Sequence, residues 1–195
     1  MTVLNPIEEY SDFDSITDRI KGSKLVGVRY TAGDRDGDRG ESPPVYSNER
    51  ATELRADIEL FFDARISLAI QWAMRGFDYG LSLKIEENVF CGDLDEDWYL
   101  PWKSVLGREV RGVRSAWLKP SNSSIYALWS VAFEFDSENS VAIALGRIED
   151  DDSVDFSPDS LVVFWGSKYA SAYKVPDSTG DAYGGYGEPE FSESS

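Results

Sequence analysis

The chain has 195 residues, of which 42% are hydrophobic and 13% aromatic, so it can bury a core and is not disordered overall. It carries 36 acidic against 19 basic residues, and its net charge of −17 repels nucleic acid and anionic membranes and attracts basic proteins. The absence of histidine and the single cysteine, Cys91, exclude His-dependent catalytic triads, His and thiolate metal clusters and internal disulfides.

The first predicted element is a helix over residues 11–20, SDFDSITDRI, whose apolar residues share one face: Phe13, Ile16 and Ile20. Gly22 stands where a helix C′ residue would, and glycine adopts a positive φ there without strain. Residues 22–30, GSKLVGVRY, are predicted to form a strand. The segment 32–48 is rich in Gly, Pro and charged residues, so it is predicted to be a mobile loop.

The next two segments alternate apolar and polar residues, which is the pattern of strands with one buried face. Residues 57–72, DIELFFDARISLAIQW, alternate on both sides of a polar break and therefore predict a hairpin. Residues 81–85, LSLKI, predict a further strand. The first half of the chain thus reads helix, strand, hairpin, strand.

An acidic segment with aromatic residues follows the last of these strands. It contains six residues that we take as candidates for partner binding: Asp93, Asp95, Glu96, Asp97, Trp98 and Tyr99. A glycosidase also uses carboxylates near aromatic side chains, but its general acid needs a carboxyl in an apolar pocket that raises the pKa. Adjacent acids are typical of a solvated and jointly ionised surface, so we interpret this cluster as a binding surface.

Residues 100–165 repeat the pattern of the first half. LPWKSVL (100–106) predicts a short helix, with Pro101 suited to its first turn, and Gly107 follows in the C′ position. The strand GREVRGVRS (107–115) comes next. Four of its residues are identical to those of the first strand: Gly22 and Gly107, Gly27 and Gly112, Val28 and Val113, Arg29 and Arg114.

The second hairpin, VAFEFDSENSVAIAL (131–145), aligns with the first without a gap, and LVVFW (161–165) then corresponds to LSLKI. The apolar positions of the two hairpins coincide: Ile58, Leu60, Phe62, Leu68, Ile70 and Trp72 with Val131, Phe133, Phe135, Val141, Ile143 and Leu145. This repetition predicts a duplication in which a pseudo-twofold relates residues 11–87 to residues 98–165. One unit alone has an apolar sheet face that it cannot bury.

We therefore predict an α+β fold in which tandem helix–strand–hairpin–strand units form one mostly antiparallel, β-rich domain over residues 1–175. The units would bury their apolar faces together, either as one continuous sheet backed by helices or as a sandwich. Residues 176–195, rich in Gly, Ser and acids, are predicted to be a flexible tail. The repeated arginines Arg29 and Arg114 are expected to pair with carboxylates across the sheet.

No sequence motif points to a cofactor or a metal ion, and we expect neither. The phosphate-binding patterns GxxxxGK[ST] and GxGxxG are missing. The run DRDGDRGE (34–41) has Arg39 where a calcium-binding EF-hand needs glycine, and Val45 where it needs glutamate. A second acidic run is interpreted in the same way as a solvated turn, and its acids are further candidates for partner binding: Glu149, Asp150, Asp151 and Asp152.

The expected location is the cytoplasm. The chain has no run of 18 apolar residues that would cross a membrane, and its start, MTVLNPIEEY, lacks the basic and apolar segments of a secretory signal. A single cysteine also fits a reducing compartment. The sequence gives no prediction of the oligomeric state.

In charge, size and style of repeat, the chain resembles the immunity proteins encoded beside bacterial polymorphic or contact-dependent toxins. The resemblance implies a non-catalytic protein that binds a cognate toxin domain and blocks its active site, and it carries over no individual residue. Under it the acidic clusters would attract a basic toxin, and Trp98 and Tyr99 would anchor it. Three alternatives remain open: a nucleic-acid mimic that inhibits a DNA-binding protein, a hydrolase that uses only carboxylates, and a structural or carbohydrate-binding β module.

Overall fold

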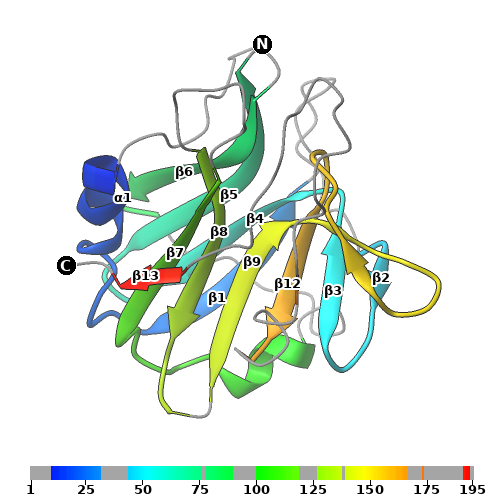
Figure 1. Cartoon of the computed structure of the whole chain (residues 1–195). Helices are drawn as coiled ribbons and strands as arrows, with labels where there is room; N and C mark the ends of the chain where they lie inside the picture. The colour runs from blue at the N-terminus through cyan, green and yellow to red at the C-terminus, as the bar shows by residue number, and fades with distance from the viewer. Residues whose placement is uncertain are drawn as a thin grey trace.

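The computed structural model describes residues 10–31, 44–75, 78–89, 100–118, 127–137, 139–166, 173 and 191–193. In Figure 1 these residues form two antiparallel sheets that pack face to face, with short helical elements at the sides. The predicted α+β class is wrong, because 57% of the described residues are in strands and 8% in helix. Both helical candidates are shorter than the roughly 12–15 residues at which a helix becomes stable by itself, so the sheets dominate.

The helical elements are α1 (Tyr10–Thr17) and a 3₁₀ turn, η1 (Leu100–Ser104). The strands follow in chain order: β1 (Leu25–Thr31), β2 (Tyr46–Ser47), β3 (Ala51–Leu54), β4 (Asp57–Phe62), β5 (Ile66–Arg75), β6 (Asp78–Glu87), β7 (Gly112–Leu118), β8 (Ala127–Glu134), β9 (Ser140–Leu145), β10 (Arg147–Ile148), β11 (Val154–Asp155), β12 (Leu161–Trp165) and β13 (Phe191–Glu193). Their order in space shows how the two halves of the chain are related.

The same meander of four strands occurs in both sheets. The four-stranded sheet has the order β1-β4-β5-β6, and the seven-stranded sheet has the order β13-β7-β8-β9-β12-β3-β2. Each half of the chain therefore contributes a first strand, a hairpin and a last strand in the same spatial order. β10 and β11 form a separate two-stranded hairpin between β9 and β12 in the chain.

Both predicted hairpins are confirmed, and their registers are equivalent. In β4–β5 the opposed pairs are Ile58 with Ile70 and Leu60 with Leu68. In β8–β9 they are Val131 with Ile143 and Phe133 with Val141. These are the pairs that the alignment of the two halves makes equivalent. Their side chains are buried between the sheets, where the two apolar faces meet.

The two halves meet through reciprocal backbone hydrogen bonds around the bridge between Lys24 and Glu109. Each bond has a counterpart in which the halves exchange roles: Gly22 N to Val110 O (2.9 Å) with Gly107 N to Leu25 O (2.7 Å), and Leu25 N to Arg108 O (3.0 Å) with Val110 N to Ser23 O (2.9 Å). Gly22 and Gly107 both have a positive φ, of 80° and 79°, as their C′ positions predict. The local arrangement is that of a pseudo-twofold.

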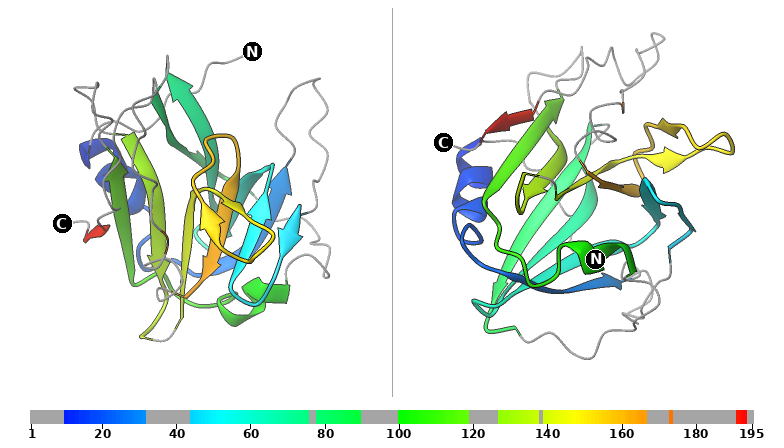
Figure 2. Two further views of the ribbon diagram at one scale, coloured as in Figure 1. Left: turned by 45° about the vertical axis from the view of Figure 1, so that its right-hand side comes forward. Right: turned by 90° about the horizontal axis from the view of Figure 1, so that it is seen from below.

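The helical elements cover different sides of the sandwich (Figure 2). On one side α1 places Phe13 edge-on against Trp117 of β7, with ring centroids 6.1 Å apart. On another, Trp102 of η1 donates its indole N–H to the Tyr30 hydroxyl of β1 (2.5 Å) and packs edge-on against Trp165 of β12. Each helical element therefore contacts the first strand of the other half.

The outward faces of the two sheets differ in polarity. On the four-stranded sheet polar and charged residues alternate with the core positions, and Arg29 pairs with Glu59 and lies over the Phe61 ring. On β7–β8 Arg114 pairs with Glu134 (2.9 Å), which stands diagonally across the ladder because Ala132 is directly opposite Arg114. The expectation that both repeated arginines pair with carboxylates across the sheet is confirmed. The rest of the outward face of the seven-stranded sheet is mostly apolar, as described below.

The predicted loop and tail are only partly covered by the described residues. Of the loop 32–48, residues 32–43 lie outside them, and residues 44–48 contain strand β2. Of the tail 176–195, residues 176–190 and 194–195 lie outside them, and residues 191–193 form strand β13, which pairs with β7. Both short strands therefore extend the seven-stranded sheet at its two edges.

Candidate partner-binding surface

The two predicted acidic clusters differ in what the structure describes of them. The first lies outside the described residues in its entirety: Asp93, Asp95, Glu96, Asp97, Trp98 and Tyr99. The second, Glu149 to Asp152, forms the turn that connects β10 to β11. The candidate surface is therefore built from this second cluster and the strands beside it.

The β10–β11 turn has a fixed backbone conformation. Glu149 N donates to Ser153 O (2.9 Å), and Asp152 N donates to Glu149 O (3.0 Å). Asp152 has a φ of 64°, in the left-handed region that aspartate tolerates better than most residues. Hydrogen bonds from Ser153, through its hydroxyl and its backbone N–H, lower the pKa of the Asp151 carboxyl. The Asp151 carboxyl is thus ionised at neutral pH.

The turn is tied to strand β2 through the Asp152 carboxylate. Its Oδ1 accepts a hydrogen bond from the Tyr46 hydroxyl (2.8 Å) and another from Asn48 Nδ2 (3.0 Å). The bond to Asp152 raises the pKa of the Tyr46 phenol, so the phenol stays a protonated donor. Asn48 is itself held, because its Oδ1 accepts from Arg50 N and Ala51 N, both at 2.8 Å.

A buried carboxylate makes a second tie. Glu53 of β3 is only 5% exposed, and its Oε2 accepts the backbone N–H of Ile148 at 2.8 Å. On the exposed side of the hairpin Arg147 pairs with Glu149, which raises the pKa of the Arg147 guanidinium. The hairpin is thus fixed to the edge of the seven-stranded sheet through Ile148 of β10 and through Asp152 in its turn.

Two exposed hydrophobic residues lie beside the acidic turn. Val45 is 51% exposed and Tyr46 is 45% exposed, which places them among the most exposed large hydrophobic residues that the structure describes. The segments 45–53 and 147–155 together hold seven acidic and two basic residues. An aromatic and aliphatic centre with a charged rim is the usual composition of a protein–protein contact.

Sequence reasoning missed Val45 and Tyr46, which it placed in a mobile loop. A signal was present, since PVYSN has a β-branched and an aromatic residue between a proline and an asparagine that starts a turn. Nothing in the sequence places this segment next to residues about a hundred positions later. Figure 1 shows β2, β3 and the β10–β11 hairpin together at one side of the molecule.

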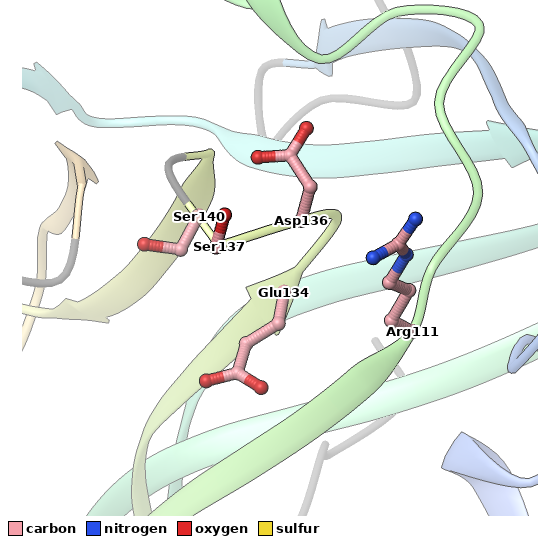
Figure 3. A pocket seen from close by; sticks show the side chains of 5 residues that line it. All are labelled: Arg111, Glu134, Asp136, Ser137 and Ser140. Atoms are coloured by element: carbon pink, nitrogen blue, oxygen red, sulfur yellow. The ribbon is translucent and has the colours of Figure 1, made fainter.

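A second feature, a shallow polar pocket of about 280 Å³, lies at the turn of the β8–β9 hairpin. Arg111, Glu134, Asp136, Ser137 and Ser140 line it, and in Figure 3 the carboxylates of Glu134 and Asp136 point apart. Each carboxylate has an arginine partner, Arg114 for Glu134 and Arg108 for Asp136. This arrangement does not offer the unpaired carboxyl in apolar surroundings that a general acid needs.

The described part of the chain contains neither a candidate metal site nor a membrane-spanning helix. No three His, Cys, Asp or Glu residues gather there in a way that could hold a metal ion. None of the helices in the described ranges has the length and apolar character needed to cross a membrane. Comparison with protein-family models, with curated proteins and with solved structures found no match. The functional interpretation therefore depends on the geometry of the chain itself.

Proposed function

We propose that this chain is a non-catalytic binding protein whose partner is a basic protein. The observation that supports this most strongly is the acidic turn Glu149–Asp152, held in place beside the exposed Val45 and Tyr46. The carboxylates supply long-range attraction to a basic surface, and the aromatic and aliphatic side chains supply short-range contact. The surface comprises β2, β3 and the β10–β11 hairpin, and we refer to it as the acidic edge.

The fixed geometry of the acidic edge is better explained by a role in binding than by a role in solubility alone. A surface that is already ordered loses less conformational entropy when a partner binds, so more of the contact energy appears as affinity. Solubility alone needs only dispersed exposed charge, without hydrogen bonds that hold each group. The ties from Tyr46, Asn48 and Glu53 to the hairpin are therefore an argument for a preformed contact surface.

The class of binding protein that fits best is an immunity protein that acts in the cytoplasm of a toxin-producing bacterium. Toxins that act on nucleic acid carry basic substrate channels, and an acidic inhibitor complements them. The net charge of −17 and the resemblance in size and repeat style support this class. The inhibitor would act by covering the toxin's active site, with no bond made or broken.

The test begins with affinity capture from the native host, using the full-length chain as bait, and continues with the purified partner. The variant is Asp150→Asn/Asp151→Asn, and the matched control is Asp12→Asn/Asp14→Asn on α1, far from the acidic edge in Figure 1. At low ionic strength we expect the association rate constant to fall about tenfold for the variant and to change less than about twofold for the control. The salt dependence of the rate should become shallower for the variant alone.

Tyr46→Ala tests the short-range part of the contact. We expect dissociation to become about tenfold faster, because exposed aromatic anchors dominate interface energetics. Equal association rates for the variant and control pairs, together with unchanged dissociation for Tyr46→Ala, would show that the partner binds elsewhere. Co-expression then tests the class: a partner whose toxicity survives in the presence of this chain would contradict an immunity role.

A further inference from the structure

The face of the seven-stranded sheet that points away from the other sheet is apolar and covered. Five of its residues alternate with the core positions and are at most 4% exposed: Ala132, Ala142, Ala144, Val162 and Phe164. Trp129, 2% exposed, lies at the irregularity of the β7–β8 ladder and joins this face through its contact with Tyr173. The outward face of the four-stranded sheet carries polar residues at the corresponding register: Glu59, Gln71, Lys84 and Glu86. The outer face of the seven-stranded sheet is therefore apolar, whereas that of the four-stranded sheet carries polar residues.

Tyr173 is a described residue that covers part of this apolar face. It is 3% exposed, its ring stacks on Trp129 with centroids 4.9 Å apart, and it lies against Phe164 at 5.4 Å. Its hydroxyl donates to the backbone oxygen of Leu145. Burial raises the pKa of the phenol, so the hydroxyl remains a donor. The segment after β12 is thus anchored on the sheet rather than free of it at this point.

Gly146 provides the space for this anchor. A Cβ at this position would lie 2.8 Å from the Tyr173 hydroxyl oxygen and 3.1 Å from the backbone oxygen of Asp155. The first distance is shorter than a Cβ atom tolerates and the second is tight, so a larger residue at 146 would displace the Tyr173 hydroxyl. The position of Tyr173 therefore depends on a glycine at residue 146, directly after β9.

Strand β13 pairs with the centre of β7, at the edge of the same sheet. Phe191, Ser192 and Glu193 stand opposite Ala116, Ser115 and Arg114. A ladder of three residues gains few hydrogen bonds, and these are of similar size to the entropy lost on ordering three residues. Because β13 and β7 belong to one chain, their pairing is intramolecular and avoids the entropy loss of bringing two molecules together. A weak pairing can therefore form.

We propose that β13 is a guard strand, which the Tyr173 anchor keeps at the edge of β7 and which prevents β7 from pairing with β7 of a second copy. A seven-residue edge strand is a template for strand addition, and proteins commonly block such an edge with a very short strand. The opposite edge of the same sheet ends in the two-residue β2.

The edge of β7 is suited to pairing with β7 of a second copy of this chain. Two antiparallel β7 strands related by a twofold through Ser115 would place Arg114 opposite Ala116, so no like charges would meet in the ladder. The net charge of −17 opposes such association at a distance and is screened at physiological salt. Removal of the guard strand should therefore produce dimers whose affinity increases with salt concentration.

The test compares the full chain with a variant lacking residues 191–195 and a matched control lacking only residues 194–195. Mass is measured by light scattering over a roughly hundredfold range of protein concentration, at low and moderate salt. We expect the first deletion to lower the dimer dissociation constant at least about tenfold, and the control to behave as the full chain does. Equal masses for all three proteins at every concentration would overturn the proposal.

Two further measurements locate the effect at β7. In the deletion variant at low concentration, the protection of β7 amides from hydrogen exchange should fall about tenfold, and it should return on dimerisation. Gly146→Ala should release the anchor and give partial dimerisation, and adding Tyr173→Phe, which removes the clashing hydroxyl, should reverse part of it. Unchanged β7 protection in the deletion variant would show that β13 does not guard this edge.

Discussion

Replacing Glu53 tests whether a buried carboxylate fixes the β10–β11 hairpin to the seven-stranded sheet. Glu53 lies in β3, between β2 and β12, with 5% of its surface exposed. Its Oε2 accepts the N–H of Ile148 at 2.8 Å, which is the tie between the sheet and the start of the hairpin. Alanine at this position leaves the Ile148 N–H without that acceptor, whereas glutamine keeps an acceptor oxygen and removes only the charge.

The magnitude follows from the kind of hydrogen bond and the burial of its partners. A hydrogen bond to a charged group contributes about 1.5–3 kcal/mol, and a neutral one about 0.5–1.5 kcal/mol. Ile148 is half-buried, so water replaces part of what the carboxylate supplies. We therefore expect Glu53→Ala to lower the free energy of unfolding by about 2 kcal/mol and Glu53→Gln by about 1 kcal/mol.

The assay is urea denaturation with unchanged m-values, together with hydrogen exchange at the Ile148 amide. The control is Glu49→Ala, an exposed acid on the same segment, which should change stability by less than about 0.5 kcal/mol. Equal stability for Glu53→Ala and Glu49→Ala would refute the reasoning. The hairpin would then be held by the contacts of Asp152 with Tyr46 and Asn48 alone.

Two other predictions concern backbone strain and pH. Gly22→Ala and Gly107→Ala should each lower the free energy of unfolding by about 1 kcal/mol and by similar amounts, because both positions have a positive φ in equivalent turns; thermal denaturation measures this. The pKa of Asp151 is lowered in the folded chain, so its contribution is present above the ordinary aspartate pKa and is lost as pH falls through the folded-state value. Carboxyl NMR titration should show that low midpoint, and Ser153→Ala should raise it.

The strand pairing could be predicted because alternation with period two determines which residues face each other. Once Ile58, Leu60, Leu68 and Ile70 are assigned to one face, a tight hairpin places them in register, as the structure has them. The same holds for the second hairpin. The positive φ of the repeated glycines was also predictable, because few other residues adopt it at a C′ position.

The fold class could not be predicted because helical periodicity in short segments does not determine how much helix forms. LPWKSVL forms only the five-residue η1 turn, and its main role is to bury Trp102 against Tyr30 and Trp165. Strand β3 was missed for a different reason. All four of its residues are buried, so it shows no alternation, and it lies between a charged loop and a hairpin.

One part of the candidate site could be predicted from the sequence, and the other part could not. The acidic turn was visible as a run of carboxylates, and sequence reasoning identified Glu149–Asp152 as partner-binding candidates. Its neighbours Val45 and Tyr46 reach it only through the pairing of β2 with β3 and of β3 with β12. Contacts of that kind join residues far apart in the chain, and no local pattern encodes them.

Two of the parts that break the pseudo-twofold lie together at the acidic edge, whereas β13 lies at the opposite edge of the sheet. Beyond the two four-stranded meanders, β2–β3 and β10–β11 are additions to different halves. One is inserted before the first hairpin, and the other lies after the second. Both nevertheless come together through Tyr46, Asn48, Glu53 and Asp152. These additions also place Ala51 and Leu54 in the shared core, so they stabilise the fold as well as form the charged surface. Their convergence on one charged surface supports the proposed binding function.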